Sequence, residues 1–277
     1  MLTHSFIHLP GIGTKTEEKL WQAGCHHWQQ WQGNPPVKLP NSSLPELSRL
    51  LAMSLEELEK GPAFFSKRLP ANEQWRLFSH FRKRTAFLDI ETTGLGPGAE
   101  ITTIALYDGD IVHCYINGRN LDDFEKDIWK YDILVTYNGK GFDIPVLERW
   151  FRIQLTQAHI DLRYILAKLG FKGGLKGCER QLGMDRGALD GVDGYFAVLL
   201  WQDYINYNNE KALETLLAYN IEDTVNLERL LIEAYNRNVL LTPFGEELLL
   251  PLPEPPQSSH HPDLDTVRQI KSRLSGS

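Results

Sequence analysis

The stretch of sequence that decides the fold is FLDIETTG, residues 87–94. Two apolar residues are followed by two acidic residues, Asp89 and Glu91, which are separated by a single residue. Thr-Thr-Gly comes directly after them. Residues two apart on a strand point to the same face of a sheet, so these carboxylates project together. An unpaired carboxylate is costly in an apolar interior. We therefore expect a buried strand whose acidic pair is compensated, although such a pair is also common on solvated strands.

The residues around this stretch alternate with period 2, which is typical of strands. Strands are predicted at 85–93, 101–109, 110–118 and 133–139, with a short one at the start of 158–166. A tight turn at Asp108-Gly109 joins the second and third strands, so the first three form an antiparallel meander. Helices are predicted near 121–130, 143–153, 175–183, 194–206 and 210–236. This order predicts an α/β fold, a mixed sheet of three antiparallel strands plus parallel strands, flanked by helices.

The rest of the chain has a different character, so we divide it into four parts: 1–33, 34–84, 85–236 and 237–277. The first holds a Gly11-x-Gly13 turn and a short helix that ends at Gly24. Residues 34–45 contain four prolines and form a linker, before helices near 45–60 and 71–84. In the first of these, Ser54 and Glu57 could form an internal capping box. The last part holds six of the fifteen prolines within 243–262, so we expect a Pro-rich, flexible tail.

The composition is that of a globular protein without secretory or membrane signals. Of the 277 residues, 42% are hydrophobic, which is ample for a packed core. The three cysteines form no C-x-x-C pair, so neither a disulfide framework nor a zinc site is indicated. No stretch approaches the roughly 18 apolar residues of a membrane span, and the first residues lack a basic start and an apolar core. We expect a cytoplasmic protein without membrane association.

The charge is divided unevenly along the chain. Residues 1–85 carry 11 Lys and Arg against 7 Asp and Glu, a balance of +4, and the remainder carries 18 against 29, a balance of −11. The net charge of −7 argues against nucleic acid as a partner unless several carboxylates hold divalent cations. A basic solvated face beside an ordinary acidic domain explains the division equally well. The basic run Arg82-Lys83-Arg84 is either a solvated helix end or a phosphate contact.

Two further motifs carry acidic residues that could join the first pair. In YNGKGFDIPVL, residues 137–147, Asp143 follows a strand and begins a helix, where open α/β sheets place their sites. An aspartate at this position could equally be a helix N-cap. In YNIEDTVNLERL, residues 219–230, Tyr219 and Asp223 are four apart and share one helical face. Because such a pair is also common in core-facing helices, the argument depends on the three motifs together.

The ordered set D-x-E, N-x-x-x-x-D and Y-x-x-x-D resembles the three exonuclease motifs of the DEDD 3′-5′ exonuclease superfamily, which has the ribonuclease H-like fold. The tyrosine is typical of the DEDDy branch. The segments HIDLRYIL and GLKGCERQLGM, residues 159–166 and 174–184, are similar to segments of its free-standing YprB-type members. The Gly-x-Gly turn at the front resembles a helix-hairpin-helix element. The resemblance runs from about residue 85 to residue 236.

The resemblance implies a metal-dependent 3′-5′ exonuclease that hydrolyses phosphodiester bonds at single-stranded DNA or RNA ends. Its catalytic residues would be Asp89, Glu91, Asp143, Tyr219 and Asp223. The four carboxylates would hold two Mg²⁺ or Mn²⁺ ions, because hard divalent cations select carboxylate oxygens and an ion pair stabilises both reacting oxygens. Tyr219 would orient the attacking water, since an unperturbed phenol is a poor base at neutral pH.

Residues beside the motifs are implied to bind the substrate: Thr92, Thr93, Gly94, Asn138, Lys140 and Lys176. The first three would let backbone approach the terminal nucleotide, and the others would contact phosphate or sugar. The Gly-x-Gly turn would offer its backbone N–H groups to a phosphate, unless the front is merely structural. A non-catalytic nucleic-acid-binding module and a ribonuclease H-type endonuclease are the alternatives. No protein partner is indicated.

Overall fold

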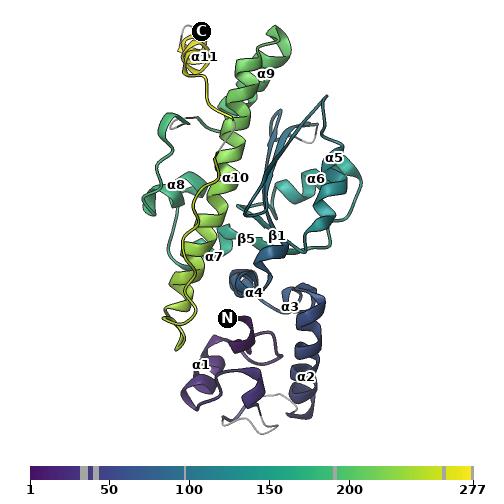
Figure 1. Cartoon of the computed structure of the whole chain (residues 1–277), viewed down its shortest axis with the longest axis vertical. Coiled ribbons are helices and arrows are strands. Elements are labelled where there is room, and N and C mark those ends of the chain that lie inside the picture. The colour runs from purple at the N-terminus through teal and green to yellow at the C-terminus, as the bar shows by residue number, and fades with distance from the viewer. Residues whose placement is uncertain (32–36, 40–43, 97, 190–191, 258–259, 276–277) are drawn as a thin grey trace.

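The computed structural model describes residues 1–31, 37–39, 44–96, 98–189, 192–257 and 260–275. Its centre is a mixed sheet (Figure 1). The strands are β1 (Thr85–Thr92), β2 (Ile101–Tyr107), β3 (Val112–Ile116), β4 (Ile133–Thr136) and β5 (Ala158–Asp161). Their order is β3-β2-β1-β4-β5, in which β1 pairs antiparallel with β2 and parallel with β4. The predicted fold class, the meander and all five predicted strands are confirmed.

Helices cover both faces of the sheet and build the N-terminal part. They are α1 (Thr14–Gln22), α2 (Leu44–Lys60), α3 (Ala63–Ser66), α4 (Phe78–Phe81), α5 (Asp123–Asp127), α6 (Asp143–Phe151), α7 (Leu162–Lys168), α8 (Gly174–Gln181), α9 (Gly194–Tyr207), α10 (Glu210–Val239) and α11 (Leu264–Ser275). Short 3₁₀ helices are η1 (Leu2–His4), η2 (Trp28–Gln30), η3 (Ala71–Leu77), η4 (Arg82–Arg84), η5 (Ile128–Lys130) and η6 (Gly187–Leu189). The long helix α10 begins at a side-chain cap, because Asn209 Oδ1 accepts from Lys211 N at 3.1 Å.

The alternation of β1 decides where its acidic pair points. Leu88 packs in one core with Phe124 of α5 and Leu147 of α6. The preceding Phe87 packs in the opposite core, which contains residues of α10. Figure 1 shows α10 on one side of the sheet and α5 and α6 on the other. Because side chains alternate along a strand, the Asp-x-Glu pair lies on the same face as Phe87 and meets α10.

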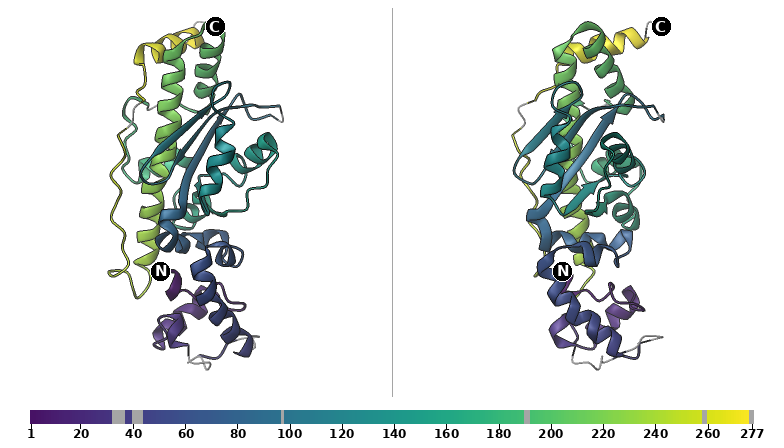
Figure 2. Two further views of the ribbon diagram at one scale, coloured as in Figure 1. Left: turned by 45° about the vertical axis from the view of Figure 1, so that its right-hand side comes forward. Right: turned by 90° about the vertical axis from the view of Figure 1, so that its right-hand side faces the viewer.

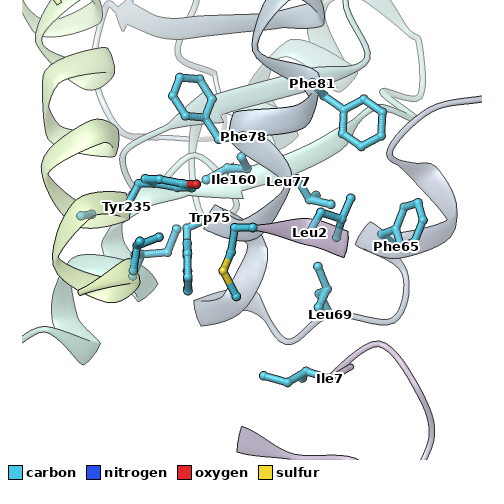
Figure 3. Close-up of a cluster of buried hydrophobic side chains, with 14 of the residues drawn as sticks. Leu2, Ile7, Phe65, Leu69, Trp75, Leu77, Phe78, Phe81, Ile160 and Tyr235 are labelled. Atoms are coloured by element: carbon cyan, nitrogen blue, oxygen red, sulfur yellow. The ribbon is translucent and has the colours of Figure 1, made fainter. Parts of the chain in front are cut away.

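The N-terminal part shares its hydrophobic core with the sheet domain. Figure 3 shows Leu2 and Trp75 beside Ile160 of β5 and Tyr235 of α10. The rings of Trp75 and Tyr235 meet edge to face, with 5.6 Å between their centroids. A buried ion pair between Arg76 and Glu17, at 3.0 Å, ties η3 to α1 in the same region. Residues 1–31 therefore contribute to the packing that supports the sheet.

Three expectations for residues 34–84 need correction or lie outside the structure. Residues 34–36 and 40–43 of the expected linker lie outside the described residues. Helix α2 is continuous, and Ser54 Oγ donates to Leu50 O at 2.7 Å, so the predicted internal capping box is wrong. The predicted helix at 71–84 is broken into η3, α4 and η4. Its residues 73–78 are all buried, which no single face of a helix could achieve.

The basic run before β1 is engaged by the protein itself. Arg82 pairs with Glu228 of α10 at 2.7 Å, and Arg84 forms an ion pair with Asp132. The run also precedes the strand, whereas the acidic pair lies in the second half of β1. These contacts disfavour the phosphate contact that the sequence left open.

The C-terminal part runs back along the longest helix and then forms a helix of its own. In both views of Figure 2, the yellow segment that contains residues 251–257 follows α10. It leads to α11, whose Val267 and Ile270 are buried against α9 and α10 residues. Helix α11 was not predicted, because the prolines before it dominate the pattern. In the described part of the chain, no helix is long and apolar enough to cross a membrane.

Candidate active site

Three acidic side chains that are far apart in the sequence meet where β1 faces α10. One carboxylate oxygen from each of Asp89, Glu91 and Asp223 lies within 4.8 Å of the other two. Glu91 is 9% exposed, Asp223 is 5% exposed and Asp89 is half-buried, so the group is shielded from bulk water on most sides. Carboxylate oxygens are the hard donors that Mg²⁺ and Mn²⁺ prefer. The donor set therefore fits a divalent cation.

Asp143 lies beside this group but is not one of the three oxygens within that distance. It is 4% exposed and begins α6, and its Oδ1 accepts from Ile90 N at 3.3 Å, between the two acidic residues of β1. Phe142, not Asp143, occupies the N-cap position of α6, so the predicted alternative of an N-cap aspartate is not observed. The position instead aims a fourth carboxylate at the same end of β1.

The raised pKa values of these carboxyl groups show that keeping them ionised in the buried site is unfavourable. Burial raises the pKa of Asp89 well above its ordinary value, and the charges of Asp143 and Glu91 raise it further. The pKa of Glu91 is also raised well above normal, first by burial and then by Asp223 and Asp143. Burial raises the pKa of Asp143 to about 7. Because each charge opposes the others, a bound cation would favour the fully ionised group.

In three of these carboxylates, one oxygen accepts a hydrogen bond from another group of the protein. Asn220 Nδ2 donates to Asp89 Oδ2 at 2.7 Å, and Thr103 Oγ1 in turn donates to Asn220 Oδ1 at 3.0 Å. Arg186 Nη2 donates to Asp223 Oδ1, as Ile90 N does to Asp143 Oδ1. Contacts of this kind orient metal ligands and leave the second oxygen to face an ion.

Asn220 and Arg186 were missed by the sequence analysis. Asn220 is fully buried next to Tyr219 in the third motif, and an asparagine in the middle of an apolar helix face was a usable signal. Arg186 lies in the loop between α8 and η6, without a motif or a spacing that singles it out.

Tyr219 lies one helical turn before Asp223 on α10 and is 3% exposed. Lys176 Nζ lies 4.7 Å from the centroid of its ring and Arg186 Cζ lies 5.5 Å from it. Burial and the nearby charges of Asp223 and Glu91 raise the pKa of the Tyr219 hydroxyl above its ordinary value. These influences favour the protonated hydroxyl, which can orient a ligand by donating a hydrogen bond.

The turn after β1 is stabilised by its own polar groups. Thr92 Oγ1 donates to Gly94 O at 2.7 Å, and Thr93 Oγ1 accepts from Glu100 N at 3.0 Å. Gly94 has φ of +156°, and a Cβ built there would meet nothing within 4 Å. The three predicted substrate residues thus form an ordered turn directly after Glu91, with an open approach at the glycine.

The other predicted substrate residues lie at two different places. Lys176 is close to the acidic group, where its charge opposes the rise in the pKa of Glu91, and its Nζ donates to Val192 O. Asn138 and Lys140 lie in the turn between β4 and α6, where their backbone N–H groups donate to the Asp161 carboxylate at 2.8 and 3.1 Å. The Lys140 side chain is exposed. Only Lys176 is therefore drawn into contact with the site residues.

A cavity of about 230 Å³ opens beside Arg186. Its lining residues are Lys176, Arg180, Met184, Asp185, Arg186, Val192 and Asp193. A larger cavity of about 420 Å³ lies between α10 and the Pro-rich segment and also reaches Arg186, and neither cavity is lined by a clustered carboxylate. Lys176 lines the smaller, more basic cavity and also contacts Tyr219, so this cavity lies next to the site.

A family model described as the RNase H superfamily matches residues 86–235. This range runs from the start of β1 into α10 and includes the four carboxylates and Tyr219. Comparison with curated proteins and comparison with solved structures each return no match.

Proposed function

The matched range spans more than half of the chain, which therefore belongs to the RNase H superfamily, and from this premise we propose that it is a metal-dependent 3′-5′ exonuclease. The RNase H-like domain supports a nuclease that acts on nucleic acid. The observation that carries the finer proposal is the meeting of Asp89, Glu91 and Asp223, with Tyr219 one turn before Asp223. This combination supports an exonuclease of the DEDDy type over a ribonuclease H-type endonuclease.

Each carboxylate has a role in the proposal. Asp89, Glu91 and Asp223, whose oxygens cluster, would hold Mg²⁺ or Mn²⁺ together with Asp143, which lies beside them. When bound, such ions supply Lewis-acid polarisation of the phosphate and lower the pKa of the attacking water. The protein donors Asn220 and Ile90 N fix the carboxylates in advance, so that little rearrangement accompanies binding.

Tyr219 and the lysines complete the proposed site. The protonated Tyr219 hydroxyl donates to the attacking water and fixes its direction of approach, because its pKa is raised by burial and by Asp223. Lys176 faces the substrate phosphate beside the basic cavity, and the turn from Thr92 to Gly94 receives the terminal nucleotide. The segment around Lys176, LKGCERQLG, supports placement with the YprB-type members.

The experiment is a digestion of matched single-stranded DNA and RNA, each labelled at the 5′ or the 3′ end, with Mn²⁺ and with chelator. We expect a stepwise ladder from 5′-labelled strands and immediate release of labelled mononucleotide from 3′-labelled strands. The variant Asp89→Asn and the chelator should both abolish it. Internal cuts would favour the endonuclease instead, and binding without cleavage would favour a non-catalytic module.

A further inference from the structure

Among the described residues, Arg186 forms the only ion pair with a clustered carboxylate. Its Nη2 donates to Asp223 Oδ1, and its side chain is 4% exposed. We propose that Arg186 is a positioning residue, which fixes one oxygen of Asp223 so that the other faces the divalent cation. This inference rests on the proposed function, because it assigns a role toward the same ion site.

The second half of the guanidinium fork is bound to another buried acid. Arg186 Nη1 donates to Glu179 Oε2 at 2.7 Å, and Glu179 is fully buried in α8. A planar guanidinium that binds two carboxylates through separate nitrogens has little freedom to turn. The direction of the Nη2 donor, and hence the orientation of the Asp223 carboxylate, is therefore fixed by α8.

The hydrogen-bond network that starts at Asp223 also ends on α10. Asn226 Nδ2 donates to Glu179 Oε1 at 2.8 Å, and Asn226 lies three residues after Asp223 on α10. The chain of contacts thus runs from Asp223 through Arg186 and Glu179 back to the next turn of the same helix. The negative charge of Glu179 balances the positive charge of Arg186, so Asp223 keeps a net charge to offer to an ion.

A second role for Arg186 predicts the opposite result. If the guanidinium acted as a competing cation, it would occupy an oxygen that the ion needs, and its removal would strengthen ion binding. If it positions the carboxylate, its removal frees Asp223 to turn and weakens ion binding. Loss of an outer contact of this kind costs about 10-fold to 100-fold in metal affinity or activity. The sign of the change therefore separates the two roles.

The test is the Mn²⁺ affinity of the full chain, measured by calorimetry for the unmodified protein and for Arg186→Lys. Lysine keeps the charge but cannot bind both acids with one planar fork. We expect Mn²⁺ to bind Arg186→Lys about 10-fold to 100-fold more weakly. In the digestion assay its kcat should fall at low Mn²⁺ and recover at high Mn²⁺, with little change in the KM for the strand.

The matched control is Arg76→Lys. Arg76 is also 4% exposed and also bridges two buried acids, Glu17 at 3.0 Å and Glu73 at 2.9 Å, but these lie in the N-terminal part. Both variants should unfold at lower temperature, because each disturbs a buried ion-pair network. Only the variant at 186 should lose Mn²⁺ affinity, so a general loss of stability cannot produce the expected result.

A second variant keeps the proposal testable if Arg186→Lys folds poorly. Arg186→Met combined with Glu179→Gln removes both charges together, and the glutamine can still accept from Asn226. Mn²⁺ affinity that is unchanged or higher in the folded variants overturns the positioning role. If the unmodified protein itself fails to bind Mn²⁺, the proposed function fails, and that result differs from a loss confined to the variants.

Discussion

Asp89 is the residue at which stability and function oppose each other most directly. Its pKa is raised by burial and by three neighbouring carboxylates, so its charge destabilises the metal-free protein. We predict that Asp89→Asn, in chelator, is as stable as the unmodified protein or more so, while its nuclease activity falls by roughly 100-fold or more. Urea unfolding and the digestion assay measure the two effects. Activity that survives the substitution would remove Asp89 from the site.

Tyr219 and Asp223 share one face of α10 but should differ in importance. Tyr219→Phe removes one hydroxyl and leaves every carboxylate in place, so we expect a loss of about 10-fold to 100-fold in kcat. Asp223→Asn removes an ion ligand, and its loss should be larger. Single-turnover digestion at saturating Mn²⁺ compares them. Equal losses for the two variants would contradict an orienting role for Tyr219.

His8, which lies in the N-terminal part and not in the acidic group, also makes the stability of the protein depend on pH. It is 2% exposed and its Nε2 donates to Ser54 Oγ, because the Ser54 hydroxyl proton already goes to Leu50 O. Protonation would place a charge on this buried ring, and the backbone hydrogen bond to Ser5 offsets only part of that cost. Burial, with the nearby charge of Arg68, lowers the pKa of His8 to about 3.

The sign of the His8 effect follows from proton binding. Between the unfolded pKa of about 6.5 and the folded value, the unfolded chain binds more protons, so stability falls as the pH falls. We predict a loss of about 2 kcal/mol between pH 7 and pH 5 from this residue, at 1.36 kcal/mol per pH unit below about 6.5. In His8→Gln the loss over that interval should be smaller by this amount. If urea unfolding shows the same pH dependence in both proteins, the predicted contribution of His8 is wrong.

At the scale of elements, the turn between β4 and α6 decides where Asp143 lies. A Cβ on Gly139 would come within 2.2 Å of Thr136 Oγ1, which already accepts from Gly139 N and bonds His159. Gly139→Ala should therefore destabilise the protein by about 1–3 kcal/mol and lower its activity by shifting α6.

Gly141, in the same turn, provides the control. A Cβ there would lie 3.4 Å from Asn138 Oδ1, which is an ordinary contact. Gly141→Ala should change the stability by less than about 1 kcal/mol and leave the activity nearly unchanged. Urea unfolding and digestion rates of the two variants are compared, and equal effects would show that the turn does not constrain Asp143.

The sequence predicted those elements whose pattern is local. Period 2 found the strands, and alternation along β1 put Asp89 and Glu91 on one face before any contact was known. The break in residues 71–84 was not predictable, because it arises when Trp75 and its neighbours are all buried by distant elements. Helix α11 was missed for a related reason, since Val267 and Ile270 are the only apolar side chains that its described residues bury, too few to make a helical pattern.

The same distinction holds within the site. The four carboxylates and Tyr219 were found because their order along the chain resembles a family pattern. Arg186 was not found, and Glu179 was noticed only as part of GLKGCERQLGM, because their contacts depend on how α8 and the segment after it pack against α10. For the basic run the sequence left a solvated helix end and a phosphate contact open, and the pairing of its arginines with Glu228 and Asp132 disfavours the second.

At the scale of the whole molecule, the N-terminal part and the sheet domain share one core and should unfold together. Trp75 is 1% exposed and packs against Tyr235 across that boundary. We predict that Trp75→Ala lowers the free energy of unfolding by about 3–5 kcal/mol in a single transition. Circular dichroism and fluorescence should report the same midpoint. Trp129→Ala, at a site 47% exposed, is the control and should have little effect.

The central claim is that carboxylates from β1, α6 and α10 form one ion site, and anomalous scattering from a crystal soaked in Mn²⁺ tests it most directly. We predict one peak among Asp89, Glu91 and Asp223 and a second between Asp89 and Asp143. A crystal that holds Mn²⁺ elsewhere while these carboxylates bind none would contradict the claim.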